Sequence, residues 1–380
     1  MAKHRFKLFQ LLRLQLLQRP PLRLLELKLQ RQRLRSTIIG NGGPRDTGHC
    51  RTYQIGHRIN TLYMGYFSLA PARSSALGLR CHHLLSHNTM NPYDEPLEIS
   101  APIAWDLAAR YCRHDPATGV TCAWNHGLWQ LLRLMGIAGT AARRSEFYRR
   151  EIRKAVAGKN RPAILISGAS DYAMLAQIAL EFAELNTTPA VTVLDICETP
   201  LQLNQWFADR AGFSIQTVRS DFLEYASPEQ FDVVCADSFI GRFPYAQWPK
   251  VAERFFTLLK QGGTLLTASR LRTNDPSTRI TFPADHVTAF RDTVRANLLK
   301  ADAPAGFDLE LATTAAEQYA RLQVNYPLHT MHELRAPLEL AGLVIQSLDH
   351  HQHGAGQIEN IRAPSVAAAS TFLLAVATRP

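Results

Sequence analysis

Four acidic residues each come just after a short apolar run, an arrangement typical of sheets that bind nucleotides. They are Asp171, Asp195, Asp221 and Asp237. Carboxylates at such positions can accept hydrogen bonds from ribose hydroxyls or an exocyclic amine, orient a substrate, or remove a proton from it. Ligands of parallel α/β sheets bind beyond the carboxyl ends of the strands. The sequence therefore predicts that the four carboxylates share one ligand-binding edge.

The first of these turns reads Ser167-Gly-Ala-Ser-Asp-Tyr-Ala173. Compared with the dinucleotide-binding pattern G-x-G-x-x-G/A, Gly168 and Ala173 match, and Ser170 takes the place of the middle glycine. That glycine lets the backbone approach a pyrophosphate, so Ser170 argues against NAD. Gly168 still allows a tight turn, and a helix beginning near Asp171 offers free N–H groups to a carboxylate. The alternative is a plain strand-to-helix turn that Asp171 caps.

The other three carboxylates suit different parts of a nucleotide-like ligand. Asp195 can accept from ribose hydroxyls, or it is a surface acid at a strand end. Asp221 can accept from an exocyclic amine while Phe222 stacks on a purine; the alternative is a loop acid beside a core aromatic. Asp237, followed by Ser238, can orient a substrate or remove a proton, or it is a helix N-cap.

The elements that must position these residues alternate along the chain. Apolar runs and helical stretches over 162–272 predict a parallel sheet covered on both faces. Expected strands are 163–167, 190–195, 214–218, 231–236 and 263–269, and expected helices are 171–185, 200–211 and 246–260. A helix over 331–341 and strands 343–349 and 369–378 follow, with His350, His351 and His353 in the loop between the two strands.

Two helical segments flank this array and are the natural lid over its ligand edge. Residues 97–158 show three helical stretches, which we place as a cap in front of the sheet, and residues 280–325 are helical in pattern and predict an insertion. Ordinary core packing is the alternative for every aromatic or histidine in them. The candidates for substrate contact are Trp124, His126, Trp129, Tyr319 and Tyr326.

Charge is distributed unevenly along the chain. The net charge of its 380 residues is +10, but residues 1–35 hold ten of the 42 Lys and Arg and one of the 32 acids. The remainder holds 32 basic and 31 acidic side chains, a net charge of +1. This nearly neutral body argues against a nucleic-acid partner. The basic first segment fits an amphipathic helix, a transit peptide or disorder, and we expect residues 1–89 to be an unstructured or non-native extension.

The six cysteines are scattered without a C-x-x-C pair. Free thiols in or beside predicted strands, such as Cys197 and Cys235, fit a reducing compartment, so we expect a cytoplasmic protein. The clusters His82-His83 and His350–His353 lack carboxylate or Cys partners at zinc spacing, and we predict no metal site. The sequence also predicts no membrane span, because no apolar run reaches about 18 residues.

Residues 160–380 resemble a class I S-adenosylmethionine-dependent methyltransferase. The matching stretches are Ile164–Asp171, Val193–Ile196, Arg219–Phe222, Phe231–Asp237 and Leu258–Leu266. The resemblance implies an α/β fold with a doubly wound, seven-stranded, mostly parallel sheet, Rossmann-like, whose last strand, Ala369–Thr378, is antiparallel. It divides the chain into the extension 1–89, a helical cap over 90–158 and a methyltransferase domain over 159–380, with a helical insertion at about 275–327.

The resemblance also implies S-adenosyl-L-methionine as cofactor. Gly168 would lie under its methionine part, Asp195 at the ribose, Asp221 with Phe222 at the adenine, and Asp237, the candidate catalytic residue, near the transferring methyl. The full set of implied cofactor-binding residues is Gly168, Ala169, Ser170, Asp171, Asp195, Ile196, Asp221, Phe222, Asp237 and Ser238.

The chain departs from the family pattern in the first turn. The second and third of the usual alternating glycines fall on Ser170 and Tyr172, and the acid that usually precedes the first glycine by two residues is Ile166. That acid commonly helps to hold the cofactor's ammonium group. We hypothesise that Asp171, at the same turn, takes over this role.

The favoured interpretation is an enzyme that transfers a methyl group from S-adenosylmethionine to a small-molecule or carrier-bound acceptor. A non-catalytic binding protein built on the same fold is the first alternative. An NAD-dependent oxidoreductase is the second, and Ser170 argues against it.

Overall fold

The computed structural model describes residues 93–380 apart from 115–118, 274, 301–306 and 354–369. All of them belong to the compact unit Leu84–Pro380. The expectations for residues 1–89, including His82 and His83, lie outside the described residues.

The described residues form a seven-stranded sheet in the order β3-β2-β1-β4-β5-β7-β6. Its pairs are parallel except that β7 runs antiparallel to both β5 and β6. The strands are β1 (Ala163–Ser167), β2 (Ala190–Asp195), β3 (Ile215–Arg219), β4 (Phe231–Asp237), β5 (Leu259–Leu271), β6 (Val344–His353) and β7 (Ser370–Thr378). The doubly wound, seven-stranded, mostly parallel sheet expected from the resemblance is confirmed, with its last strand antiparallel.

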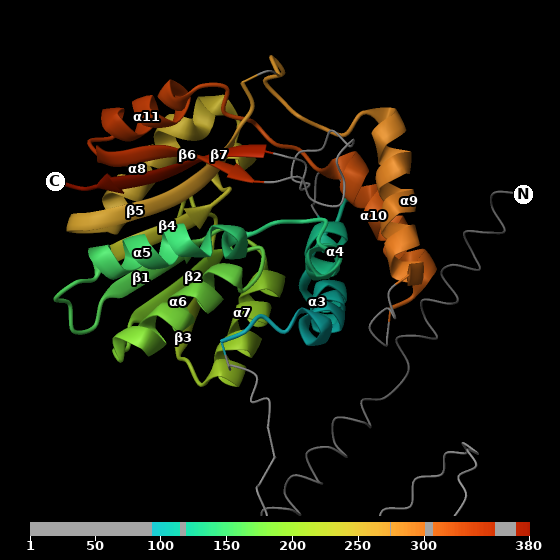
Figure 1. Ribbon diagram of the computed structural model, residues 1–380, viewed down its shortest axis with the longest axis horizontal. Helices are drawn as coiled ribbons and strands as arrows, with labels where there is room; N and C mark the ends of the chain where they lie inside the picture. The colour runs from blue at the N-terminus through green and yellow to red at the C-terminus, as the bar shows by residue number, and fades with distance from the viewer. Residues whose placement is uncertain (1–92, 115–118, 274, 301–306, 354–369) are drawn as a thin grey trace, which may run out of the picture. The chain divides into compact units, whose positions relative to one another are not determined.

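Helices cover both faces of the sheet because side chains alternate along each strand. In β1, Ile164 and Ile166 pack in one core while Leu165 packs in the other. The first core is completed by α5 (Ser145–Ala155), α6 (Ala173–Leu185) and α7 (Glu198–Ala211), and the second by α8 (Trp248–Leu258) and α11 (Met331–Leu340). Figure 1 shows the two groups of helices on opposite sides of the sheet.

A third hydrophobic core belongs to the added helices. It joins α4 (Ala123–Leu134) to α9 (Ala284–Lys300) and α10 (Leu309–Leu322), so the cap and the insertion share one core. Helix α3 (Leu97–Tyr111) packs against α4 and against α7 of the sheet domain. In Figure 1, α3 and α4 accordingly lie between α7 and the α9–α10 pair.

Most predicted elements are present with small shifts at their ends. The segment expected as a helical insertion contains two helices, α9 and α10. The predicted loop at His350, His351 and His353 is wrong, because these residues continue β6 and pair with β7 as far as Ser370. No helix among the described residues has both the length and the hydropathy needed to cross a bilayer.

Candidate functional site

A cavity of about 350 Å³ opens at the carboxyl ends of β1, β2 and β4. This is where the strand order reverses, since β1 lies between β2 and β4, and doubly wound sheets bind ligands at such a point. The volume is within the range of small-molecule sites. All ten predicted cofactor-binding residues line it: Gly168, Ala169, Ser170, Asp171, Asp195, Ile196, Asp221, Phe222, Asp237 and Ser238.

Gly168 makes the first turn possible. Its φ of +68° lies in the left-handed region, and its N–H donates to the Leu194 carbonyl at 3.1 Å. The Phe239 ring lies directly against it, so that a Cβ on Gly168 would be 2.2 Å from a ring carbon. Both the backbone conformation and the close ring therefore require glycine here.

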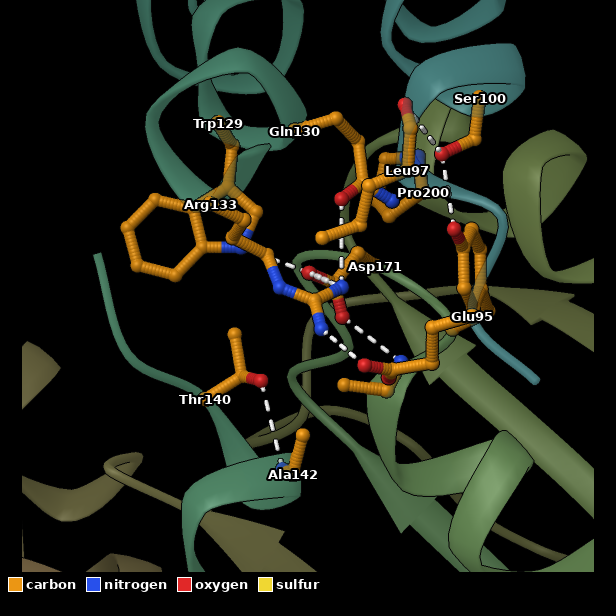
Figure 2. A network of polar contacts seen from close by, with 12 residues as sticks. Glu95, Leu97, Ser100, Trp129, Gln130, Arg133, Thr140, Ala142, Asp171 and Pro200 are labelled. Atoms are coloured by element: carbon orange, nitrogen blue, oxygen red, sulfur yellow. Dashed lines mark hydrogen bonds and ion pairs between the residues drawn. The ribbon is translucent and has the colours of Figure 1, made fainter. Parts of the chain in front are cut away.

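The Asp171 carboxylate connects this turn to the helical cap (Figure 2). Its Oδ1 accepts from the backbone N–H of Ala173 at 2.7 Å, and its Oδ2 accepts from Trp129 Nε1 at 2.8 Å and Arg133 Nη1 at 2.9 Å. The same guanidinium donates from Nη2 to Glu95 Oε2 at 2.6 Å. Both Asp171 oxygens are thus engaged, and an ammonium group would have to compete with a buried guanidinium for them.

Arg133 is a buried cation between two carboxylates. Its side chain is only 4% exposed, as is that of Asp171. Burial raises the pKa of Glu95, although Arg133 opposes the rise. For Arg133 itself burial lowers the pKa, but Asp171 and Glu95 outweigh it and the net shift is upward. The guanidinium therefore lies where its positive charge compensates both carboxylates inside the protein.

Asp195 and Ile196 form the wall at the end of β2. Asp195 Oδ1 accepts from the backbone N–H of Cys197 at 2.8 Å, which leaves Oδ2 for other donors. Burial raises the pKa of Asp195 to about 6. Ile196 is 65% exposed, an unusual exposure for a large apolar side chain next to a cavity. A hydrogen-bond acceptor, Asp195, and an exposed apolar side chain, Ile196, therefore lie side by side at this wall.

Asp221 and Phe222 differ in exposure. Asp221 is exposed, and its Oδ1 accepts from the backbone N–H of Leu223 at 2.8 Å. Phe222 is only 5% exposed and packs edge-on against Phe239, with 5.0 Å between ring centroids, and against Phe255. The open stacking ring expected from the sequence is thus mostly a core aromatic, and only its edge can contact a ligand.

The surroundings of Asp237 differ from those of a free base. Arg144 donates to Oδ1 from Nε at 2.8 Å and to Oδ2 from Nη2, and the Tyr148 hydroxyl donates to Oδ1 at 2.8 Å. A bidentate guanidinium and a hydroxyl occupy both carboxylate oxygens and hold the group in one orientation. The next residue, Ser238, has a φ of +54°, which is uncommon outside glycine and clusters at functional sites.

One part of the remaining wall of the cavity is polar and cationic. It includes Ser269 and Arg270 at the end of β5 and Asn325 and Tyr326 in the segment after α10. Burial lowers the pKa of Arg270 to about 9, and the nearby cation of Arg272 adds to this. A positive potential at this wall would favour an acceptor that carries a negative or strongly polar group.

Of the five lid candidates, three line the cavity and two do not. His126, Trp129 and Tyr326 line it. Tyr319 is 1% exposed in the core shared by α4, α9 and α10, and Trp124 packs edge-on against its ring. Core packing, the alternative for each of the five, therefore describes Trp124 and Tyr319.

The structure also brings together four possible metal ligands that the prediction of no metal site did not consider. Cys112, Cys122, His126 and Cys197 place one potential ligand atom each within 4.8 Å of one another. The sequence prediction rested only on neighbouring histidines and C-x-x-C pairs. One signal was available, because Cys122 and His126 are four residues apart on a predicted helix and must share a face. Arg133, Arg144 and Tyr148 were missed without any such signal.

No family model and no curated protein matches this chain. Solved structures do resemble it. The S-adenosylmethionine-dependent methyltransferase SibL is 13% identical, with 73% of this chain and 62% of that chain covered and a TM-score of 0.39. The N-methyltransferase NodS from Bradyrhizobium japonicum, in complex with S-adenosyl-L-homocysteine, is 13% identical over 62% of this chain and 86% of that chain, with a TM-score of 0.35.

A third similar structure is an O-methyltransferase family 2 protein from Planctomyces limnophilus in complex with apigenin. It is 12% identical over 63% of this chain and 62% of that chain, with a TM-score of 0.36. At these identities and scores the likeness concerns the fold alone. The strand order and the cavity at its reversal point are the observations on which a function can be based.

Proposed function

We propose that this protein transfers a methyl group from S-adenosyl-L-methionine to a small-molecule or carrier-bound acceptor. The observation that carries the proposal is the convergence of Gly168, Asp195 and Asp221 on one cavity at the reversal point of the sheet. These three residues come from three different strand ends, and each has the type that its part of an adenosyl ligand requires.

The residues of the cavity fit this cofactor. Ser167 and Ser269 line the cavity, and their buried hydroxyls have no hydrogen-bond partner among the described residues. Buried polar groups are normally satisfied, so these two call for a polar ligand. Asp195 keeps Oδ2 for a ribose hydroxyl, and the exposed Ile196 offers an apolar surface to a base. The fit is weaker at Phe222, which presents only an edge.

When bound, the cofactor would supply an electrophilic methyl group, and the chain's own work would be to hold and orient the reactants. Asp195 and Asp221 would fix the adenosine end through hydrogen bonds. At the other end, Asp237 is held by Arg144 and Tyr148 in one orientation, which suits a group that positions an acceptor. We accordingly propose Asp237 as a positioning group. The cationic wall around Arg270 favours an acceptor with a negative or polar group.

Binding can be tested by calorimetric titration of the full chain with S-adenosylhomocysteine and, separately, with NADH. We expect binding of the first at one site and no binding of the second. Asp195→Asn should weaken the binding of S-adenosylhomocysteine by about 10- to 150-fold, since a hydrogen bond to a charged group is worth about 1.5–3 kcal/mol. Asp209→Asn, an exposed acid on α7, is the matched control and should bind normally. Normal binding by Asp195→Asn, or none by the unaltered chain, would overturn the proposal.

Transfer is a separate question from binding. It can be followed as release of S-adenosylhomocysteine from S-adenosylmethionine in the presence of a panel of acceptors with hydroxyl, amine or carboxylate groups. Release that depends on one acceptor class supports the enzyme. Tight cofactor binding with no acceptor-dependent release across the panel supports the non-catalytic binding protein and rejects the transfer step.

A further inference from the structure

Three cysteines and a histidine from three separate elements meet beside the cavity. Cys112 caps the carboxyl end of α3, Cys122 is the N-cap of α4, His126 lies one helical turn farther along α4, and Cys197 is the N-cap of α7. Cys197 is 85 positions from Cys112 and 75 from Cys122 in the sequence. Three ligands thus come from the helical cap and the fourth from the turn after β2.

Three of the six distances between their ligand atoms match the edges of a tetrahedron around one ion, and the other three are no longer than 4.8 Å. A zinc ion with Zn–S bonds of about 2.3 Å and Zn–N bonds of about 2.0 Å places two sulfurs about 3.8 Å apart, and a sulfur and a nitrogen about 3.5 Å apart. The Sγ of Cys197 lies 3.7 Å from that of Cys112 and 3.7 Å from that of Cys122. His126 Nδ1 lies 3.4 Å from Cys112 Sγ.

A disulfide, a multi-metal cluster and plain thiol packing all fit these distances less well than a single ion does. A disulfide needs sulfurs about 2.05 Å apart, and no pair in the cluster is that close. A cluster of several metal ions would separate its ligands farther, because its own ions are spread out. Buried thiols can pack as small apolar groups, but such packing does not require an imidazole nitrogen within contact distance of the sulfurs.

We propose that Cys112, Cys122, His126 and Cys197 bind one zinc ion in a closed tetrahedral site. Each thiol gives its proton to solvent as its Zn–S bond forms, and His126 coordinates as the neutral imidazole. No oxidation state changes, and one negative charge remains on the site. Because the protein supplies all four ligands, no position is open for a substrate, and the ion is structural.

The surroundings of the cluster favour metal-bound thiolates. Cys122 and Cys197 occupy the N-cap positions of α4 and α7, next to the positive ends of these helices, which favour a nearby thiolate. Thr199 Oγ1 lies 3.1 Å from Cys112 Sγ, where its hydroxyl can donate to a thiolate. Outer hydrogen bonds of this kind orient metal ligands and tune the metal.

The proposed ion would connect the cap to the cofactor wall. The backbone N–H of Cys197 holds Asp195, and His126 itself lines the cavity. Zinc would fix the turn that places the predicted ribose acceptor. The proposal goes beyond methyl transfer, and it does not require that transfer to be correct, since it depends only on the four ligands.

The first test is the metal content of the full chain, purified reduced, without chelator and without a histidine tag, by inductively coupled plasma mass spectrometry. We expect one zinc per chain. Cys122→Ser and Cys197→Ser should each lose most of it, whereas Cys235→Ala, a buried cysteine of β4 outside the cluster, should keep it. Negligible zinc in the unaltered chain even after incubation with zinc, or equal zinc in all variants, would overturn the proposal.

A second test needs no variant and so does not depend on whether a variant folds. The unaltered chain is treated with an alkylating reagent before and after zinc is removed by a chelator, and modified cysteines are identified by mass spectrometry. Labelling of Cys112, Cys122 and Cys197 should appear only after removal, and cobalt added to the stripped chain should give the visible absorption of thiolate-bound Co²⁺. Equal labelling of these cysteines before and after treatment with the chelator, or no cobalt absorption, rejects the site. Neither readout involves the methyl donor.

Discussion

Replacing Arg133 with methionine should destabilise the fold more than any surface charge substitution. The change keeps an unbranched apolar stem but removes the guanidinium cation that lies between Asp171 and Glu95 (Figure 2). Because the pair with Asp171 is 4% exposed on both sides, water cannot replace the lost partner. Breaking one partner of a buried pair costs about 3–5 kcal/mol. The expected loss in the free energy of unfolding at pH 7 is of that size.

The size of this loss should depend on pH in a defined direction. Burial already raises the pKa of Glu95, and Arg133 opposes the rise, so its removal raises that pKa further. A carboxyl whose folded-state pKa exceeds the unfolded value binds more protons when folded between the two values. Stability of the variant therefore improves as pH falls through the raised pKa. The penalty should be full at pH 7 and smaller in mildly acidic buffer.

Urea unfolding followed by circular dichroism measures these differences directly. The matched control is Arg335→Met, which breaks a half-exposed pair with Glu339 on α11 and should cost about 0.3–0.5 kcal/mol. Adding Glu95→Gln to the Arg133→Met variant should recover part of the loss, because one of the two unpaired charges disappears. A loss below about 1 kcal/mol for Arg133→Met, or one that is the same at both pH values, would refute the reasoning.

Four further outcomes are expected. Tyr148→Phe removes a hydrogen bond to the Asp237 carboxylate and should lower the free energy of unfolding by about 1.5–3 kcal/mol in the same urea assay. Gly168→Ala adds both left-handed strain and overlap with Phe239, so it should cost about 2–5 kcal/mol and abolish calorimetric binding of S-adenosylhomocysteine. Gly212→Ala has the same kind of φ but open space around it and should cost only about 1–2 kcal/mol. Removing the proposed zinc with a chelator should lower the melting temperature and weaken S-adenosylhomocysteine binding, and adding zinc back should restore both.

The sheet could be predicted from sequence because its signals are local. The strand Ala190–Asp195 was expected over the residues that form it, since an apolar run ends there at an acid and a helix follows. The placement of acids after strands then implied a shared edge, and all four line the cavity. Such reasoning needs only the alternation of elements and the rule that parallel strands end on the same side.

The partners of those acids could not be predicted in the same way. Arg144 and Asp237 are 93 positions apart, and Arg133 and Asp171 are 38 apart. Nothing in a run of arginines indicates which guanidinium will meet which carboxylate once the cap has folded. For this reason Asp171 looked available for an ammonium group and Asp237 looked available as a base, although both are engaged by arginines of the cap.

The contacts between the cap and the strand ends attach the cap to the sheet domain, whereas a lid would open as a unit. Asp171 follows β1, Cys197 follows β2 and Asp237 ends β4, and each meets residues of the cap at the rim of the cavity. Lifting the whole cap would separate two buried ion pairs and the cysteine cluster at once. A cap connected at three strand ends is a fixed wall. If the proposed function is right, the cofactor and the acceptor would enter through local movement of the rim, where the exposed Ile196 and the segment at Asn325 and Tyr326 border the same cavity.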